Sequence, residues 1–215
     1  MQPGRVQFQD NQFTIPGEDG KPGTTIEIPP TLLITGMGIV PNINQCVTSD
    51  AKSPGNHLVL VGACNNAMGG SHYQQLFGTP TGGDPSLPRV DLDLGPKTAQ
   101  AVHKLIKAGL VGSAHDVSDG GVLVAIAEML IGGSSTTETI GFQSSGSLDV
   151  VACFAQSPSC YLLEVTDPRL VIKALGEIPC STLGVLTDSG SLCCNEMCVG
   201  IDQLTDAWRS TLDWS

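Results

Sequence analysis

The sequence predicts an α/β fold, or α+β in the broader sense, in which a mixed β-sheet is covered by helices. After residue 32, short apolar runs typical of strands alternate with segments whose apolar residues recur every three or four positions, as in amphipathic helices. Glycine-rich turns separate several of these strands and helices. Such alternation is typical of a sheet with helices packed on its faces.

In the first half of this region, strands are expected at 32–40, 58–62 and 112–115, and helices at 73–77, 96–110 and 122–131. The helix at 96–110 has the clearest pattern, because Val102, Leu105 and Ile106 recur at helical spacing opposite several lysines. It has a proline near its first turn and a glycine near its end, as helices often do. The segment 122–131 is almost entirely apolar and therefore predicts a buried helix.

The last third continues the alternation. Strands are expected at 138–142, 161–165 and 181–186, a pair of strands at 192–199, and helices at 168–175 and 202–212. A polar stretch of low regularity, 132–147, surrounds the first of these strands.

The chain is expected to comprise a lead-in, residues 1–31, and one domain, residues 32–215. The lead-in is rich in proline and glycine and shows no sustained helical or strand period, so it predicts loops. Because Met1 directly precedes a segment that resembles the middle of a longer chain, we expect the sequence to be a domain excised from a longer protein.

Composition excludes several classes of partner. The 21 acidic residues outnumber the 10 basic ones and give a net charge of -11, so no broad positive field is present to bind nucleic acid or an anionic membrane. The longest apolar run, 120–133, is shorter than the roughly 20 residues that a membrane-spanning helix needs. These features predict a cytoplasmic protein that meets anionic ligands through helix N-termini and a metal ion.

Eight cysteines occur at positions 46, 64, 153, 160, 180, 193, 194 and 198. Without a secretory signal, reduced thiols are the expected state. The cluster at 180–198 allows a zinc site, but it lacks the paired Cys-x-x-Cys spacing that usually supplies tetrahedral ligands. Buried, inert thiols are therefore the preferred interpretation.

The segment 114–121, Ala-His-Asp-Val-Ser-Asp-Gly-Gly, is the main candidate for a ligand site. A strand, a glycine turn and a buried helix together provide free backbone N–H donors and hard oxygen ligands, as phosphate and Mg²⁺ require. Asp116 is assigned to metal binding, and Ser118, Gly120 and Gly121 to binding of the phosphate group. Asp119 is expected mainly to cap the helix.

Two weaker candidates accompany this turn. Gly69, Gly70 and Ser71 precede a short helix and could bind an anion in the same way, although paired glycines more often form only a tight turn. We expect the two glycine junctions to line one cleft. His115 could act as a general base, but a histidine beside a strand is more often a structural residue.

Five segments together resemble the C-terminal part of the phosphoribosylformylglycinamidine synthases. They are AHDVSDGG at 114–121, GGSHY at 69–73, IPPTLLITGMGIV at 28–40, SPSCYLLEV at 157–165 and LTDAWRSTLDW at 204–214. The resemblance covers about residues 26–215, and the segments have the family's order and spacing. It implies that the lead-in, residues 1–31, is the tail of an upstream nucleotide-binding domain. The first two segments favour these synthases over other members of the AIR synthase-related superfamily.

The resemblance implies an AIR synthase-related C-terminal domain fold and an ATP-dependent C–N ligase of purine biosynthesis, which converts formylglycinamide ribonucleotide to the amidine. Asp116 falls on the family's Mg²⁺ ligand and Ser118 on a serine that contacts ATP or ADP. In long forms this pair belongs to an auxiliary nucleotide site, and the sequence leaves open whether this copy is catalytic. The implied partners are the upstream halves of the same synthase, a glutamine amidotransferase unit and the phosphoribosyl substrate.

No catalytic residue is assigned within this chain, which is expected to be inactive alone. One alternative is a non-catalytic scaffold or interaction domain whose glycine turns are structural. Another is a different superfamily member, of the selenophosphate, thiamine phosphate or carbamoyl dehydratase type. The last group is disfavoured because no nucleophilic cysteine lies near a glycine-rich N-terminal loop.

Overall fold

The computed structural model describes residues 12–15, 23–27, 35, 38–134 and 139–210. The chain divides into two compact units, residues 1–41 and 42–215. In the first unit, β1 (Gln12–Ile15) and β2 (Thr24–Glu27) form an antiparallel pair in which Phe13 faces Ile26. The prediction that the lead-in contains only loops is therefore wrong for these two segments, which are too short to show a periodic pattern.

A seven-stranded mixed sheet forms the centre of the second unit, with the order β4-β6-β3-β7-β5-β8-β9. The strands are β3 (His57–Val61), β4 (Ser113–Asp116), β5 (Gly141–Ser144), β6 (Tyr161–Val165), β7 (Cys180–Thr187), β8 (Ser191–Cys194) and β9 (Met197–Gly200). Neighbouring strands are antiparallel except β5 and β8, which are parallel. The predicted fold class, a mixed sheet covered by helices, is confirmed.

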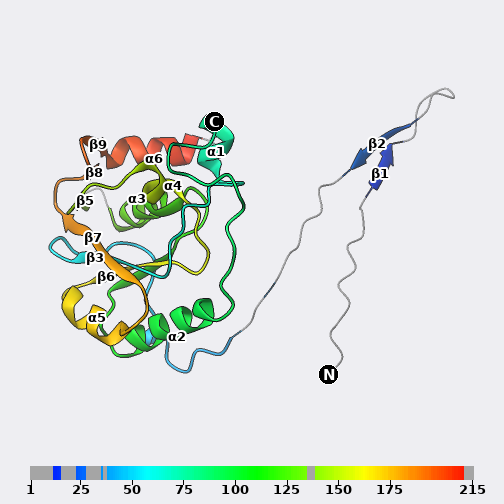
Figure 1. Ribbon diagram of the computed structural model, residues 1–215. Helices are drawn as coiled ribbons and strands as arrows, with labels where there is room; N and C mark the ends of the chain where they lie inside the picture. Colours follow the sequence, from blue (N-terminus) through cyan, green and yellow to red (C-terminus); the bar gives the residue numbers. More distant parts are fainter. Residues whose placement is uncertain (1–11, 16–22, 28–34, 36–37, 135–138, 211–215) are drawn as a thin grey trace, which may run out of the picture. The chain divides into compact units, whose positions relative to one another are not determined.

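Helices cover both faces of the sheet (Figure 1). On one face, α2 (Leu94–Lys107) and α5 (Pro168–Leu175) enclose a core that includes Val102, Val171 and the β3 side chains Val59 and Val61. On the other face, α3 (Gly121–Gly133) is the central helix of a second core, accompanied by α4 (Val150–Phe154) and α6 (Ile201–Ser210). The short helix α1 (His72–Phe77) lies on this second side.

Most predicted elements of the second unit occur in the structure. The strand at 161–165 and the helix at 168–175 have the predicted bounds, and α2, α3 and β7 differ from prediction by a few residues at their ends. The helix α4 was not predicted, because its five residues are fewer than two helical turns. None of the helices within the described ranges is long and apolar enough to cross a membrane.

Two predictions about the N-terminal and cysteine-rich segments need correction. The strand expected at 32–40 is absent at residues 35 and 38–40, which have no regular structure, and the rest of it lies outside the described residues. Cys193 and Cys198 form a disulfide, so the expectation that all thiols are reduced is wrong for this pair. The two residues face each other across β8 and β9, a register that cysteine spacing does not reveal.

One fully buried carboxylate, Glu164 on β6, connects this strand with β4 and with the loop that precedes β3. Its two oxygens accept hydrogen bonds from the backbone N–H groups of Lys52 (2.8 Å) and Ser53 (3.0 Å). They also accept from the Asn56 side-chain amide (2.7 Å) and from the Ser113 hydroxyl on β4 (2.8 Å). Burial of a carboxylate is costly unless hydrogen bonds replace its hydration, and these four donors satisfy that requirement.

Glu164→Gln should lower the free energy of unfolding by about 3 kcal/mol, because the new amide NH₂ group faces donors and leaves one of them unsatisfied. Urea denaturation followed by circular dichroism measures this change. Glu177→Gln is the matched control, since Glu177 is exposed at the end of α5 and should change stability little. Equal stability of the two variants would contradict this interpretation of Glu164.

Candidate functional site

The turn between β4 and α3 has the predicted strand–turn–helix form but a different cap. Gly120, not Asp119, is the N-cap of α3, and its φ of 81° lies in the left-handed region. Gly121 has a φ of 77°, and its N–H donates to the carbonyl of Ser118 at 3.1 Å. The prediction that Asp119 caps the helix is therefore wrong, because the two left-handed glycines place the helix start one residue later.

Both glycines are also required for space. A Cβ atom at Gly120 would lie 2.6 Å from a methyl group of Val124, and one at Gly121 would lie 2.7 Å from the backbone of Phe154. The turn thus combines positive φ angles with close packing against α4. Only glycine meets both conditions without strain.

Asp116 and Ser118 lie at the surface of this turn. The Asp116 side chain is 68% exposed, and the His115 ring nitrogen Nδ1 lies 3.7 Å from its carboxylate. Within the ranges that the structure describes, the Ser118 hydroxyl has no hydrogen-bond partner. Both side chains are therefore available to a ligand.

His115 contacts its neighbours on both sides. Its Nδ1 lies 2.7 Å from the carbonyl oxygen of Asp116, and its Nε2 lies 3.6 Å from a carboxylate oxygen of Glu128 on α3. Its side chain is only 15% exposed. These contacts support the interpretation of His115 as a structural residue that joins β4 to α3.

In the second glycine junction, the potential donors are already used within the chain. The N–H of Gly69 donates to the carbonyl of Ser86 (2.9 Å), and that of Gly70 donates to the side-chain oxygen of Gln74 (2.9 Å). The buried Ser71 hydroxyl accepts from the N–H of Gln74 (3.2 Å) and so caps α1. This geometry favours a structural role for Gly69, Gly70 and Ser71.

Gln156 joins the two glycine junctions, a role that no local sequence pattern indicates. With its amide oriented toward the surrounding donors, its side-chain oxygen accepts from the Gly120 N–H (2.7 Å) and from the His72 N–H (3.1 Å). The same oxygen lies 3.1 Å from the His72 ring nitrogen Nδ1. The expectation that the two junctions lie together is supported by this single amide.

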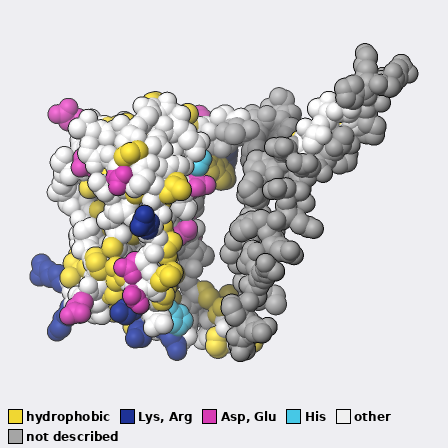
Figure 2. All heavy atoms as spheres, turned by 45° about the vertical axis from the view of Figure 1, so that its right-hand side comes forward, with side chains coloured by type: hydrophobic (Ala, Val, Ile, Leu, Met, Phe, Trp, Pro, Cys, Tyr) yellow, Lys and Arg dark blue, Asp and Glu magenta, His cyan; other side chains and the backbone are white. Residues whose placement is uncertain are grey.

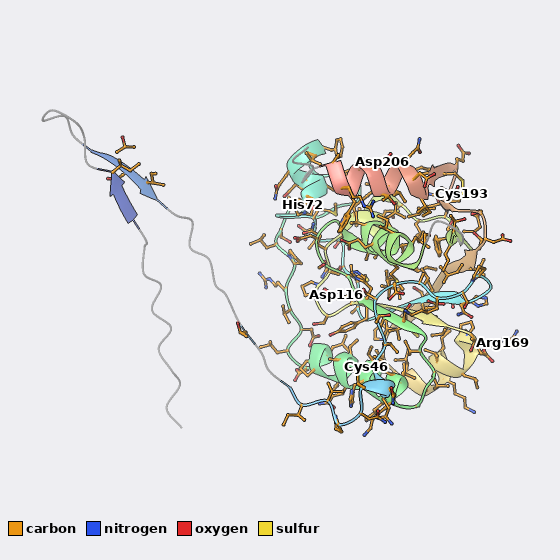
Figure 3. All side chains as sticks on the ribbon, turned by 180° about the vertical axis from the view of Figure 1, so that it is seen from behind. Cys46, His72, Asp116, Arg169, Cys193 and Asp206 are labelled. Atoms are coloured by element: carbon orange, nitrogen blue, oxygen red, sulfur yellow. A yellow bond between two sulfur atoms is a disulfide. The ribbon has the colours of Figure 1, made fainter. Side chains whose placement is uncertain are left out.

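Aromatic side chains also pack between the two glycine junctions. Phe154, the last residue of α4, stacks on Tyr73 of α1 with 5.2 Å between ring centroids, and both rings contact a small core formed by Met68, Val151 and Ala155. In Figure 3, His72 lies at α1 and Asp116 at the end of β4, on different elements. The helix α4 therefore supports both glycine turns.

The electrostatic character of the site is not set by basic side chains. Most of the Lys and Arg side chains visible in Figure 2 lie at the lower end of the unit, over α2 and α5. The helix α2 carries Lys97, Lys104 and Lys107, and α5 carries Lys173. Among the described residues, no group of three or more His, Cys, Asp or Glu side chains is placed to hold a metal ion.

A cavity of about 730 Å³ lies next to this region but does not include the predicted ligand residues. It is lined by the loop 143–148, by Val150 and Phe154 of α4, and by the β8–β9 turn around Asn195. Asn195 holds one wall, because its side chain bonds both the N–H (3.0 Å) and the carbonyl (2.7 Å) of Leu148.

The family model described as AIR synthase related protein, C-terminal domain, matches residues 53–192. The chain belongs to this family. The matched segment includes both glycine junctions, Gln156 and Glu164.

Among curated proteins, the phosphoribosylformylglycinamidine synthase subunit PurL of Bartonella quintana is 30% identical over 185 residues. The same subunit of Bartonella henselae is 32% identical over 188 residues. Each alignment covers 84% of this chain and 25% of the relative. The chain therefore spans about a quarter of the length of these relatives.

Solved structures show the same fold. Thermotoga maritima PurL complexed with FGAR aligns with a TM-score of 0.60 at 17% identity, over 75% of this chain and 30% of that one. The complex of the same protein with ATP aligns with a TM-score of 0.54 at 16% identity, over 75% and 27% of the two chains. The expected AIR synthase-related C-terminal fold is thereby confirmed.

Gln156→Leu should loosen both glycine junctions at once, because leucine has nearly the same size but cannot accept the Gly120 and His72 N–H groups. Hydrogen–deuterium exchange should become faster in peptides covering 70–73 and 118–121 and stay unchanged in β7. Gln143→Leu on the exposed face of β5 is the control and should affect neither peptide. Unchanged exchange at both junctions would show that Gln156 does not join them.

Gly121→Ala should destabilise the protein by about 3 kcal/mol, because a left-handed φ and a clash with the Phe154 backbone act together. Gly146→Ala serves as the control, since a Cβ atom there meets nothing within 4 Å. Thermal unfolding compares the two variants. A melting temperature for the Gly121 variant as high as that of the control would contradict the proposed constraint.

Proposed function

We propose that this chain is the C-terminal domain of a phosphoribosylformylglycinamidine synthase and forms one wall of a nucleotide site. The proposal is carried by one observation: a family segment that resembles PurL folds so that an exposed carboxylate, Asp116, stands beside the N-terminus of a buried helix. The first turn of such a helix presents N–H groups and a positive dipole end to an anion.

The proposed reaction is the ATP-dependent conversion of formylglycinamide ribonucleotide to formylglycinamidine ribonucleotide. ATP activates the formyl amide oxygen, and ammonia released from glutamine displaces phosphate. The relatives' name and the solved complexes of T. maritima PurL with FGAR and with ATP support this proposal. Because the chain spans about a quarter of such relatives, the remaining domains would provide the rest of the site.

The residues of the turn between β4 and α3 fit a Mg²⁺–nucleotide ligand. Mg²⁺ usually binds one or two protein carboxylates together with water and substrate phosphates, so one exposed carboxylate, that of Asp116, is sufficient on this side. When bound, the ion would neutralise charge on the phosphate oxygens. Ser118 would contact the nucleotide, and Gly120 and Gly121 would let the phosphate approach the backbone.

For the second junction, the proposed role is narrower. The N–H groups of Gly69 and Gly70 already have partners inside the chain, so this loop would shape the cleft rather than donate to the phosphate. Ser71 would hold α1, and thereby His72, against Gln156.

The full set of partners follows from the proposed reaction. The chain would assemble with the upstream halves of the synthase and with a glutamine amidotransferase unit that supplies ammonia; a solved PurLQS assembly from T. maritima contains a related fold. We place this activity in the cytoplasm, where ATP and phosphorylated sugars are available.

A non-catalytic scaffold is the second candidate function. The observation that favours it is the internal hydrogen bonding of the glycine N–H groups, because a turn whose donors are already satisfied needs no ligand. In that case the exposed Asp116 would have no role in nucleotide affinity.

Asp116→Ala should weaken binding of ADP with Mg²⁺ at least tenfold in the synthase that contains this domain, because a direct charge-assisted ligand to the metal is lost. Isothermal titration calorimetry measures the affinity. Asp206→Ala is the control, since Asp206 is an exposed carboxylate on α6 and should leave binding unchanged. Binding that is the same in both variants would favour the scaffold function.

A further inference from the structure

Two cysteines outside the nucleotide site lie sulfur to sulfur. The Sγ atoms of Cys64 and Cys160 are 3.3 Å apart. Cys64 follows the end of β3, and Cys160 directly precedes β6, the strand that pairs with β3 through Val61 and Tyr161. The pairing of the two strands thus brings together two residues that are 96 positions apart in the sequence.

The backbone around the pair permits this close approach. Gly62 has a φ of 119°, and a Cβ atom at this position would lie 2.6 Å from the carbonyl of Ser159 and 3.0 Å from the sulfur of Cys160. A glycine is therefore needed for the two segments to lie together. Ser157, which is almost completely buried, fixes the same segments, because its hydroxyl accepts from the N–H of Asn65 at 3.1 Å.

The two thiols differ in access to solvent. Cys64 is exposed, whereas Cys160 is only 1% exposed and belongs to the core beneath α3. A small oxidant from solvent can therefore reach Cys64 first. Cys160 lies behind it, within reach of the same sulfur.

Hydrogen bonding gives the two thiols opposite acidities. A hydrogen bond from Cys160, aided by one from Ser157, lowers the pKa of the Cys64 thiol below its usual value. The pKa of Cys160 is raised, chiefly by its hydrogen bond to Cys64 and also by burial. Cys64 is therefore the nucleophilic member of the pair, because the thiolate is the reactive form of cysteine.

We propose that Cys64 and Cys160 are a peroxide-sensitive dithiol, in which the exposed Cys64 is oxidised first and Cys160 then closes a disulfide. The oxidant is hydrogen peroxide or an organic hydroperoxide. The Cys64 thiolate attacks the peroxide O–O bond and forms a sulfenic acid, with release of hydroxide from hydrogen peroxide or of an alkoxide from an organic hydroperoxide. Cys160 then attacks the Cys64 sulfur; an S–S bond forms, the S–O bond breaks, and the hydroxyl leaves as water with the Cys160 proton.

The second step also has an electrostatic basis. The negative charge of the Cys64 thiolate is one of the causes that raise the pKa of Cys160. Once Cys64 becomes an uncharged sulfenic acid, that contribution disappears, and Cys160 loses its proton more easily. The resulting disulfide would tie the segment leading to His72 to the segment that carries Gln156.

The other cysteines provide internal comparisons. Cys46 is exposed and has no thiol neighbour in the described part of the chain. Cys153 is buried, and burial raises its pKa to about 12, so it should resist oxidation. Cys193 and Cys198 are already paired.

The test treats the full-length protein with one equivalent of hydrogen peroxide and maps the products by peptide mass spectrometry. The expected product is a Cys64–Cys160 cross-link that dithiothreitol reverses, formed several-fold faster than oxidation of Cys46. In Cys160→Ser, dimedone should trap a sulfenic acid at Cys64; in Cys64→Ser, Cys160 should stay reduced. Cys46→Ser is the matched control and should form the cross-link normally.

If a Cys160 variant fails to fold, peptide mapping of the oxidised wild-type protein still tests the proposal. Oxidation of Cys64 at the same rate as Cys46 would overturn the proposal. So would conversion of Cys64 to sulfinic acid without a link to Cys160.

Discussion

The arrangement of the sheet depends on the buried carboxylate of Glu164. A carboxylate at this depth is tolerated only because four donors surround it, three from the loop 52–56 and one from β4. The bond to Ser113 fixes the first residue of β4, and Asp116 is the last residue of the same four-residue strand. The position of the candidate metal ligand is therefore set from inside the core.

The segment 156–160 performs a similar role on the other side of the site. The Cys160 carbonyl accepts from the Val117 N–H (2.9 Å), Ser157 binds Asn65, and Gln156 accepts from Gly120 and His72. One short loop thus holds both glycine junctions and the end of β3. A loop with so many partners is stiff, so the first turn of α3 and the exposed carboxylate keep a fixed geometry that is suited to binding a ligand.

The sequence predicted the regular elements well where the hydrophobic pattern is long or bounded by proline and glycine, as in α2, α3, β6 and α5. It missed α4, which is too short to show a helical period. It also missed β1 and β2, two four-residue strands that pair with each other and are too short to show alternation. The role of Gln156 and the Cys193–Cys198 disulfide depend on contacts between distant or facing residues, which a single sequence does not encode in its local pattern. Asp119 was misassigned because two consecutive left-handed glycines moved the helix start.

The distribution of charge determines what this domain can contribute to a phosphate site. The chain carries a net charge of -11. The lysines of α2 and α5 belong to other elements than the turn between β4 and α3. At that turn, the N-terminus of α3 attracts an anion, whereas the carboxylate of Asp116 repels phosphate unless a cation lies between them. The proposed nucleotide site would therefore need a divalent ion at this turn, and the remaining ligands of that ion would come from the nucleotide, water or another domain.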